Sequence, residues 1–186
     1  MTRYVVLLRG INVGGKNPVP MARLREVLGE LGYENVVTYI ASGNVILSSK
    51  HGPDRIKREI EAALPKAFKL HSELIAVLVL TAAQLRAVVA DRPKGFGDQP
   101  DKYHSDAIFL MGIDATTAME AFDRREGVDA VWPGKGVIYS QRLSAQRTKS
   151  RLSKIALSPH YKSMTIRSWA TTTKLAELVK APETGA

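Results

Sequence analysis

Apolar runs alternate with amphipathic segments along the first half of the chain. Residues 4–8 form a run rich in Val and Leu, which predicts a buried strand. A helix with one apolar face is expected from Met21 to Gly32. The pattern then predicts strands at 36–41 and 45–48, a helix from Pro53 that stops at Pro65, a strand at 74–80 and a helix capped by Thr81. The predicted order is therefore β-α-β-β-α-β followed by a helix.

The second half repeats this order. The pattern predicts a strand at 107–111, a helix capped by Asp114, strands at 130–132 and 137–139, a helix over 152–157 stopped by Pro159, a strand at 164–169 and a helix at 171–180. Short segments also align between the halves, such as residues 5–10 with 107–112. We therefore expect an α+β fold, a tandem duplication of two ferredoxin-like (βαββαβ) units, each followed by a helix. A single larger α/β sheet is the alternative.

This organisation predicts the domain boundaries. Residues 1–92 form the first ferredoxin-like unit, 93–104 a linker, and 105–186 the second, basic ferredoxin-like unit. Between its first strand and its hairpin, the first half carries a Gly-rich loop at 11–20 that the second half lacks. A loop inserted into one copy of a repeat is a better candidate for function than a loop that both copies share.

The Gly-rich loop contains most of a Walker A pattern, from Gly10 to Gly15 and Lys16. The next residue is Asn17 where that pattern needs Ser or Thr for magnesium, and prolines at 18 and 20 prevent the helix that a P-loop requires. An ATPase is therefore excluded, and a weaker expectation remains. The backbone N–H groups of Gly14 and Gly15, with Lys16 beside them, are able to cradle an anion. The alternative is a tight loop that needs glycine for positive φ.

The topology brings a second loop to the same edge. In a ferredoxin-like unit the first and third strands are neighbours, so residues 9–12 should lie next to 42–44. This edge is a candidate phosphate-binding pocket. Its candidate residues are Arg9, Gly10, Asn12, Gly14, Gly15, Lys16, Asn17, Ser42 and Asn44. The alternative is that the two loops bind each other, with Asn12 and Asn44 satisfying backbone groups.

Charge is distributed unevenly along the chain. The sequence has 27 Lys and Arg against 18 Asp and Glu, a net charge of +9, yet no acidic residue lies between Asp129 and Glu177. That stretch combines cations with Trp and Tyr, a composition typical of nucleic-acid surfaces, although a solvated basic face has the same composition. The candidate nucleic-acid or anion-binding residues are Lys135, Arg142, Arg147, Lys149, Ser150, Arg151, Lys154 and Arg167.

Two details bear on how a nucleic acid would bind there. Arg147, Lys149 and Arg151 fall at the start of the helix predicted over 152–157, where the helix dipole disfavours cations unless a phosphate lies among them. The second half also places Phe109 and Tyr139 on its central strands, where RNA-recognition modules carry their stacking aromatics. The first half has no such aromatic residues.

Other function classes find little support. The chain has no cysteine, which excludes disulfides and thiolate chemistry, and its four His residues are scattered without metal-ligand spacing. His104 and Asp106 should point to one side of a strand and Ser105 to the other, so these three do not form a triad. We expect no cofactor and no metal, and no catalytic residue is identified. The longest apolar run is too short to span a membrane, and a cytoplasmic protein is expected.

Several motifs resemble one known family. Residues 8–17 (LRGINVGGKN) and 38–45 (TYIASGNV) are similar to the first two motifs of the bacterial domain-of-unknown-function family 1697. Residues 150–154 and 165–171 resemble its C-terminal motifs, although Ser168 stands where the family often has Asn. The resemblance covers nearly the whole chain. It implies a soluble bacterial protein and implies no activity.

Three functions are therefore weighed. The first is a binding protein for nucleic acid or another polyphosphate, which would bind through the basic C-terminal half. The second is a small-molecule phosphate-binding protein or transferase acting at the Gly-rich loop. The third is a structural protein that binds a partner through its sheet faces. Whether the chain is an enzyme, and its oligomeric state, are left open by the sequence.

Overall fold

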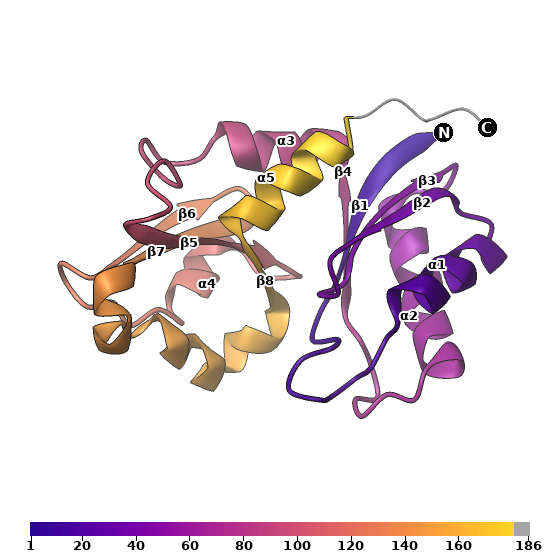
Figure 1. Ribbon diagram of the computed structural model, residues 1–186, viewed down its shortest axis with the longest axis horizontal. Helices are drawn as coiled ribbons and strands as arrows, with labels where there is room; N and C mark the ends of the chain where they lie inside the picture. Colours follow the sequence, from indigo (N-terminus) through magenta and orange to yellow (C-terminus); the bar gives the residue numbers. More distant parts are fainter. Residues whose placement is uncertain (181–186) are drawn as a thin grey trace. The chain divides into compact units, whose positions relative to one another are not determined.

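The computed structural model describes residues 1–180 (Figure 1). The chain has an α+β fold with two four-stranded antiparallel sheets, as the element order predicts. It divides into two compact units, one formed by Met1–Arg86 together with the chain from Lys174, the other by Ala87–Thr173. Within residues 1–180, no helix is long and apolar enough to cross a membrane.

The first unit contains one sheet with the strand order β2-β3-β1-β4. Both neighbours of β1 run antiparallel to it, and helices α1 and α2 lie on one side of the sheet (Figure 1). The elements are β1 (Thr2–Leu8), α1 (Met21–Glu30), β2 (Glu34–Tyr39), β3 (Asn44–Ser49), α2 (Pro53–Ala67) and β4 (Val77–Thr81).

The core of the first unit lies between this sheet and its helices. Alternate residues of β1, from Tyr4 to Leu8, pack with Ile56 and Ile60 of α2. Helix α2 continues through Pro65 to Ala67, so the predicted stop was wrong. The proline lies in the last turn, where its missing N–H removes one helical hydrogen bond and the helix runs only two residues further.

The second unit contains the other sheet, with the strand order β6-β7-β5-β8. Helix α3 (Ala82–Ala90) leads into this unit, and Thr81 caps it as predicted, because its hydroxyl accepts a 3.1 Å hydrogen bond from the Gln84 backbone. The other elements are β5 (Tyr103–Leu110), α4 (Ala115–Met119), β6 (Asp129–Gly134), β7 (Val137–Leu143), the 3-10 helices η1 (Ser144–Lys149), η2 (Leu152–Leu157) and η3 (Pro159–Ser163), β8 (Met164–Ser168) and α5 (Trp169–Leu178).

The helix predicted over 152–157 is present, and it ends before Pro159 as expected, but it is the 3-10 helix η2. Two further 3-10 helices flank it, and Leu157 is 85% exposed. Ser and Thr are frequent here and compete for backbone hydrogen bonds: the Ser150 hydroxyl accepts from the Leu152 N–H at 3.3 Å, and that of Ser158 from the His160 N–H at 3.2 Å. This competition interrupts the α-helical pattern after each turn or two.

The two faces of the second sheet are covered differently. Ile108 and Leu110 face a core shared with α4 and η2. On the opposite face, Phe109 and Tyr139 are each 1% exposed, so they are not available for base stacking as the sequence suggested. Phe96 covers Tyr139 there, with ring centroids 5.3 Å apart. Burial raises the pKa of Tyr139 to about 12, and its hydroxyl donates a 2.6 Å hydrogen bond to the Val88 carbonyl.

Candidate functional site

The two loops of the Gly-rich edge, residues 9–17 and 42–44, are joined by Asn12. The side-chain amide of Asn12 donates to the carbonyls of Val19 at 2.9 Å and Ala41 at 2.7 Å, and its oxygen accepts from the Val19 N–H at 2.7 Å. Because Ala41 lies in the turn that precedes residues 42–44, the two loops meet as the topology predicts.

Asn17 anchors the other end of the loop. Its amide donates to the Gly10 carbonyl and the Ser72 hydroxyl, both at 3.0 Å. Its oxygen accepts from the backbone N–H groups of His71 at 2.8 Å and Ser72 at 3.0 Å. Asn44, which is fully buried, donates in the same way to the Tyr39 carbonyl at 3.0 Å. The side chains of these asparagines therefore hold the backbone of the edge in place.

The tip of the loop is a tight turn from Val13 to Lys16. Gly14 and Gly15 both have left-handed φ, at 57° and 73°, and the Lys16 N–H bonds the Val13 carbonyl at 3.0 Å. These are the features of a type I′ turn, which needs positive φ at both central residues. A backbone anion cradle uses residues of alternating handedness. The geometry therefore favours the tight-loop interpretation of the two glycines, with the Lys16 side chain exposed beside them.

The remaining residues of the edge are also part of the backbone framework. The Arg9 N–H bonds the Ala76 carbonyl at 2.9 Å, and the Leu8 N–H bonds the Gly43 carbonyl at 2.8 Å. Ile40, in the neighbouring turn, was not anticipated. It has a φ of +49° and is 52% exposed, and a β-branched residue pays about 1–2 kcal/mol for a left-handed conformation.

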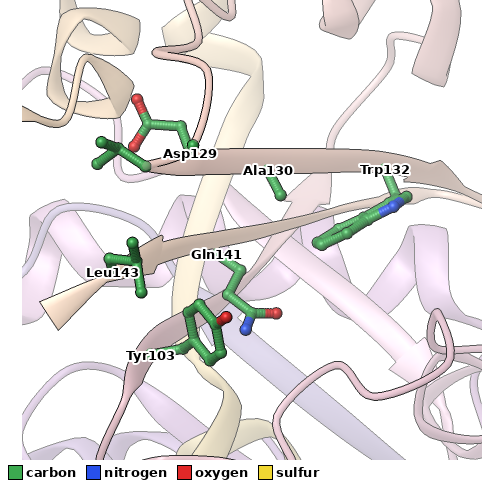
Figure 2. A pocket seen from close by; sticks show the side chains of 8 residues that line it. Tyr103, Asp129, Ala130, Trp132, Gln141 and Leu143 are labelled. Carbon is green, nitrogen blue, oxygen red and sulfur yellow. The ribbon is translucent and has the colours of Figure 1, made fainter.

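A pocket of about 350 Å³ opens on the face of the second sheet opposite the Ile108 core. Strand register and alternation place Tyr103 of β5, Gln141 of β7, and Ala130 and Trp132 of β6 on this face. Figure 2 shows the Gln141 side chain between the rings of Tyr103 and Trp132. We call this site the aromatic pocket. Its lining is completed by Gly127, Val128, Asp129 and Leu143.

Two neighbouring polar side chains on this face of the sheet lack a hydrogen-bond partner in the described chain. Gln141 is 8% exposed, and its carboxamide makes no hydrogen bond with any part of residues 1–180. Ser105, the cross-strand neighbour of Gln141, has a buried hydroxyl that is likewise unpaired within the described chain. Leaving a buried polar group unpaired costs about 1–3 kcal/mol, so such groups in a native protein require an explanation. The Ser105 hydroxyl is such a group, whereas the Gln141 amide borders the open pocket, where solvent or a ligand is able to bond it.

Cations surround the aromatic pocket. Lys102 Nζ lies 5.1 Å from the centroid of the Tyr103 ring. The Lys102 carbonyl accepts a 3.0 Å hydrogen bond from the Ser144 N–H, which places the start of η1 beside it. Lys135 lies in the turn between β6 and β7, at the other end of the pocket-lining strands. The sequence pointed to Trp132 and Lys135 but missed Tyr103 and Gln141, whose position on one face follows from the β5–β7 register.

A second pocket, of about 490 Å³, adjoins Tyr103 on the other side. It is lined by Arg92, Gly97, Asp98, Pro100, Tyr103, His104, Ser105, Ser168, Trp169, Ala170 and Thr173. Its charged groups are largely paired: Arg92 lies 3.1 Å from Asp98, and His104 Nε2 lies 3.1 Å from Asp106 Oδ2. Gly97 has a φ of +78°, and a side chain there would collide with the Trp169 ring, so glycine is required for this packing.

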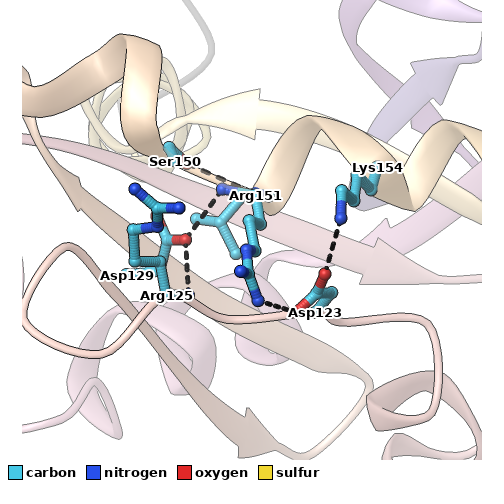
Figure 3. Close-up of polar contacts among 7 residues, drawn as sticks. Asp123, Arg125, Asp129, Ser150, Arg151 and Lys154 are labelled. Atoms are coloured by element: carbon cyan, nitrogen blue, oxygen red, sulfur yellow. Dashed lines mark hydrogen bonds and ion pairs between the residues drawn. The ribbon is translucent and has the colours of Figure 1, made fainter.

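Acidic residues fold back onto the basic stretch of the sequence. Arg151 lies 3.2 Å and Lys154 2.8 Å from the Asp123 carboxylate (Figure 3). The hydrogen bond from Lys154, joined by the contact from Arg151, lowers the pKa of Asp123. Because Asp123 precedes the acid-free stretch, the sequence did not show that two cations of that stretch share one carboxylate.

Asp129 organises the same region through the backbone. Its Oδ2 accepts hydrogen bonds from the N–H groups of Arg125 and Arg151, both at 2.9 Å (Figure 3). Burial alone would raise the pKa of Asp129, but the hydrogen bonds from Arg151, Ser150 and Arg125 outweigh it, and the pKa is lowered. Ser150 and the Arg151 N–H therefore bind a carboxylate of this chain, in the place where the sequence suggested a phosphate.

The other candidate cations fall into two groups. Arg167 is 7% exposed; its guanidinium donates to Thr165 Oγ1 at 3.0 Å, and burial lowers its pKa to about 10. Arg142 is half-buried, in register with His104 and Asp129. Lys135, Arg147 and Lys149 are exposed, and none of the three forms an ion pair with another residue of the 1–180 segment. These three and Lys102 are exposed cations of the second unit.

Within the part of the chain that the structure describes, no group of three or more His, Asp or Glu side chains is placed to hold a metal ion. Residues 1–139 match the model of a family described as "Protein of unknown function (DUF1697)". A solved structure, that of the conserved bacterial protein SP0830 from Streptococcus pneumoniae, is similar with a TM-score of 0.76 and 27% identity. The match covers 96% of this chain and 99% of that one. No curated protein matches the chain.

Proposed function

Because the chain belongs to the DUF1697 family, which is described as of unknown function, we propose its function from its own surface: it binds nucleic acid or another polyphosphate through the second unit. The observation that carries this proposal is the set of exposed cations along β7. Lys135 precedes the strand, and Arg147 and Lys149 follow it in η1. A strand of seven residues spans about 23 Å, so only an extended polyanion reaches both ends.

The proposal differs in detail from the sequence expectation. Arg151 and Lys154 are engaged by Asp123, and Arg167 is buried, so they are secondary candidates. Lys102 joins the set through its position beside η1. The cations that we expect to contact phosphates are Lys102, Lys135, Arg147 and Lys149.

The experiment is a salt titration of a fluorescein-labelled single-stranded RNA decamer. For single strands, the logarithm of the binding constant falls with the logarithm of the salt concentration, with a slope of about −0.7 per phosphate contact. Four contacts therefore predict an affinity about 50-fold lower at 200 mM than at 50 mM salt. Replacing Lys135, Arg147 and Lys149 with Ala should reduce that loss to about threefold. The matched control replaces Arg23, Arg55 and Lys57, three cations paired on helices of the first unit, and should leave the slope unchanged. Equal effects of the two triple variants would overturn the assignment.

We propose further that the two units are tandem copies of one ferredoxin-like unit. The orders β2-β3-β1-β4 and β6-β7-β5-β8 correspond strand by strand, and all pairings are antiparallel, which supports a duplication. In the second copy, η1 to η3 occupy the position of α2. The boundaries at 1–92, 93–104 and 105–186 stay a prediction, with 181–186 outside the described residues, as does the cytoplasmic location.

A second candidate function concerns the Gly-rich edge. The rigid junction of its two loops through Asn12, with the exposed Lys16 at the tip, supports a site for a phosphorylated small molecule. In this hypothesis nucleotides or phospho-metabolites raise the melting temperature of the wild type, and Lys16→Ala abolishes the shift without changing the melting temperature of the free protein. A screen without any shift would overturn this alternative.

A further inference from the structure

We propose that the aromatic pocket binds one unpaired base of a single-stranded nucleic acid. This inference rests on the proposed function and specifies its ligand, because a base is what distinguishes a nucleic acid from other polyphosphates. The pocket volume of about 350 Å³ lies in the range of small-ligand sites. The rings of Tyr103 and Trp132 flank the pocket, and a base has a flat π-face that stacks on such rings whatever its identity.

Gln141 supplies the polar contact that a base edge needs. Its carboxamide has a donor and an acceptor side by side, and glutamine pairs with bases through two such hydrogen bonds. In this protein the Gln141 side chain is directed into the pocket, and its amide is accessible there and unpaired within residues 1–180 (Figure 2). Each unpaired base offers a complementary donor and acceptor on one edge, so we expect little preference among bases.

The charges around the pocket suit the phosphates on either side of that base. Lys102 stands over the Tyr103 ring, and Lys135 lies past the opposite end of the pocket, so cations are available in both directions along a bound strand. Asp129 also lines the pocket; its Oδ2 accepts from the N–H groups of Arg125 and Arg151 (Figure 3), while its Oδ1 is buried without a partner in the described chain. The cations Lys102 and Lys135 outnumber this one negative charge along a bound strand.

The same geometry predicts that the pocket prefers single-stranded nucleic acid to a duplex. In a duplex the bases are stacked on one another and paired at their edges, so a pocket that takes both the face and the edge of a base excludes duplex DNA. The two aromatics on the central strands, Phe109 and Tyr139, are buried here, and Phe96 and Trp169 pack against the Tyr139 ring. The stacking rings proposed here lie on the same face of the sheet, but on β6 and at the start of β5.

The test compares a decamer with bases to two ligands without them, an abasic decamer and inorganic polyphosphate. Trp132→Ala should weaken binding of the RNA decamer by about tenfold, the loss typical of one stacked base, and should leave polyphosphate binding and the salt slope unchanged. Gln141→Leu should weaken the same ligand several-fold. Trp132→Phe keeps a stacking ring and should recover most of the affinity, which separates stacking from a loss of packing against Phe96.

The outcomes separate this inference from the function on which it rests. If the wild type binds polyphosphate and the RNA decamer equally, and Trp132→Ala changes neither, the base pocket is wrong and the polyanion surface stands. If the wild type binds none of the three ligands at 50 mM salt, both proposals fail. A folded Trp132→Ala protein that loses affinity for the RNA decamer alone supports the inference.

Discussion

The Gly-rich edge of the first unit and the aromatic pocket of the second treat their polar side chains in opposite ways. At the edge, the amides of Asn12, Asn17 and Asn44 all bond to nearby groups of the same unit. At the pocket, the amide of Gln141 has no partner in the described chain. A polar residue that is fully paired serves the fold, whereas one left unpaired in a cavity is available to a ligand.

The cations of the second unit also divide into those with a partner in the described chain and those without one. Arg151 and Lys154 are held by Asp123, while Lys135, Arg147 and Lys149 extend into solvent. An exposed ion pair contributes little to stability, about 0–1 kcal/mol, but it does neutralise charge that a polyanion would otherwise meet. Composition alone therefore overstates the binding surface, and the pairing of each charge decides which residues belong to it.

The largest effect expected from this comparison is at Asn17. Replacing it with Ala removes four side-chain hydrogen bonds, to Gly10, His71 and twice to Ser72, and leaves buried backbone groups unpaired. We expect the free energy of unfolding to fall by about 3 kcal/mol, measured by urea denaturation. Asn17→Asp keeps the accepting oxygen and should lose about half as much. A loss under about 1 kcal/mol for Asn17→Ala would show that the edge is not a structural anchor.

A smaller effect, of opposite sign, is expected at Gln141. Gln141→Leu replaces an unpaired amide by an apolar group of similar size, which is usually neutral or stabilising, by up to about 1 kcal/mol. The same variant is expected to weaken RNA binding, so stability and binding should change in opposite directions, a common trade-off at binding sites. A clear loss of stability in Gln141→Leu would mean that the amide has partners in solution and that the contrast with Asn17 is wrong.

Sequence patterns predicted the local features of both regions. The Thr81 and Asp114 caps are confirmed, because each places an acceptor at the first turn of its helix. The meeting of the two loops at Asn12 follows from the neighbouring positions of β1 and β3. These features depend on spacing along the chain or on strand order, which the apolar pattern reveals.

The features that the sequence did not predict depend on contacts between distant residues. Asp123 reaches Lys154 from 31 positions away, and no spacing rule reveals that pair. Gln141 is an ordinary polar residue in an alternating strand; only the packed structure shows that its amide lies in a pocket without a partner from the described chain. The 3-10 helices arise where Ser and Thr side chains compete with helical hydrogen bonds, although the apolar spacing of Leu152 and Ile155 favours a helix.

The smallest expected effect is a pH dependence at Asp129, which tests whether its carboxylate serves the fold as the asparagines do. Folding lowers its pKa, so the ionised group stabilises the protein at pH values above its unfolded pKa of about 3.9. That contribution is lost as the pH falls through the lower folded value. In urea unfolding, wild type should exceed Asp129→Asn at pH 7, and the difference should shrink steadily below about pH 4. A difference that stays constant down to pH 3 would mean that the Arg125 and Arg151 amides do not favour the charged carboxylate.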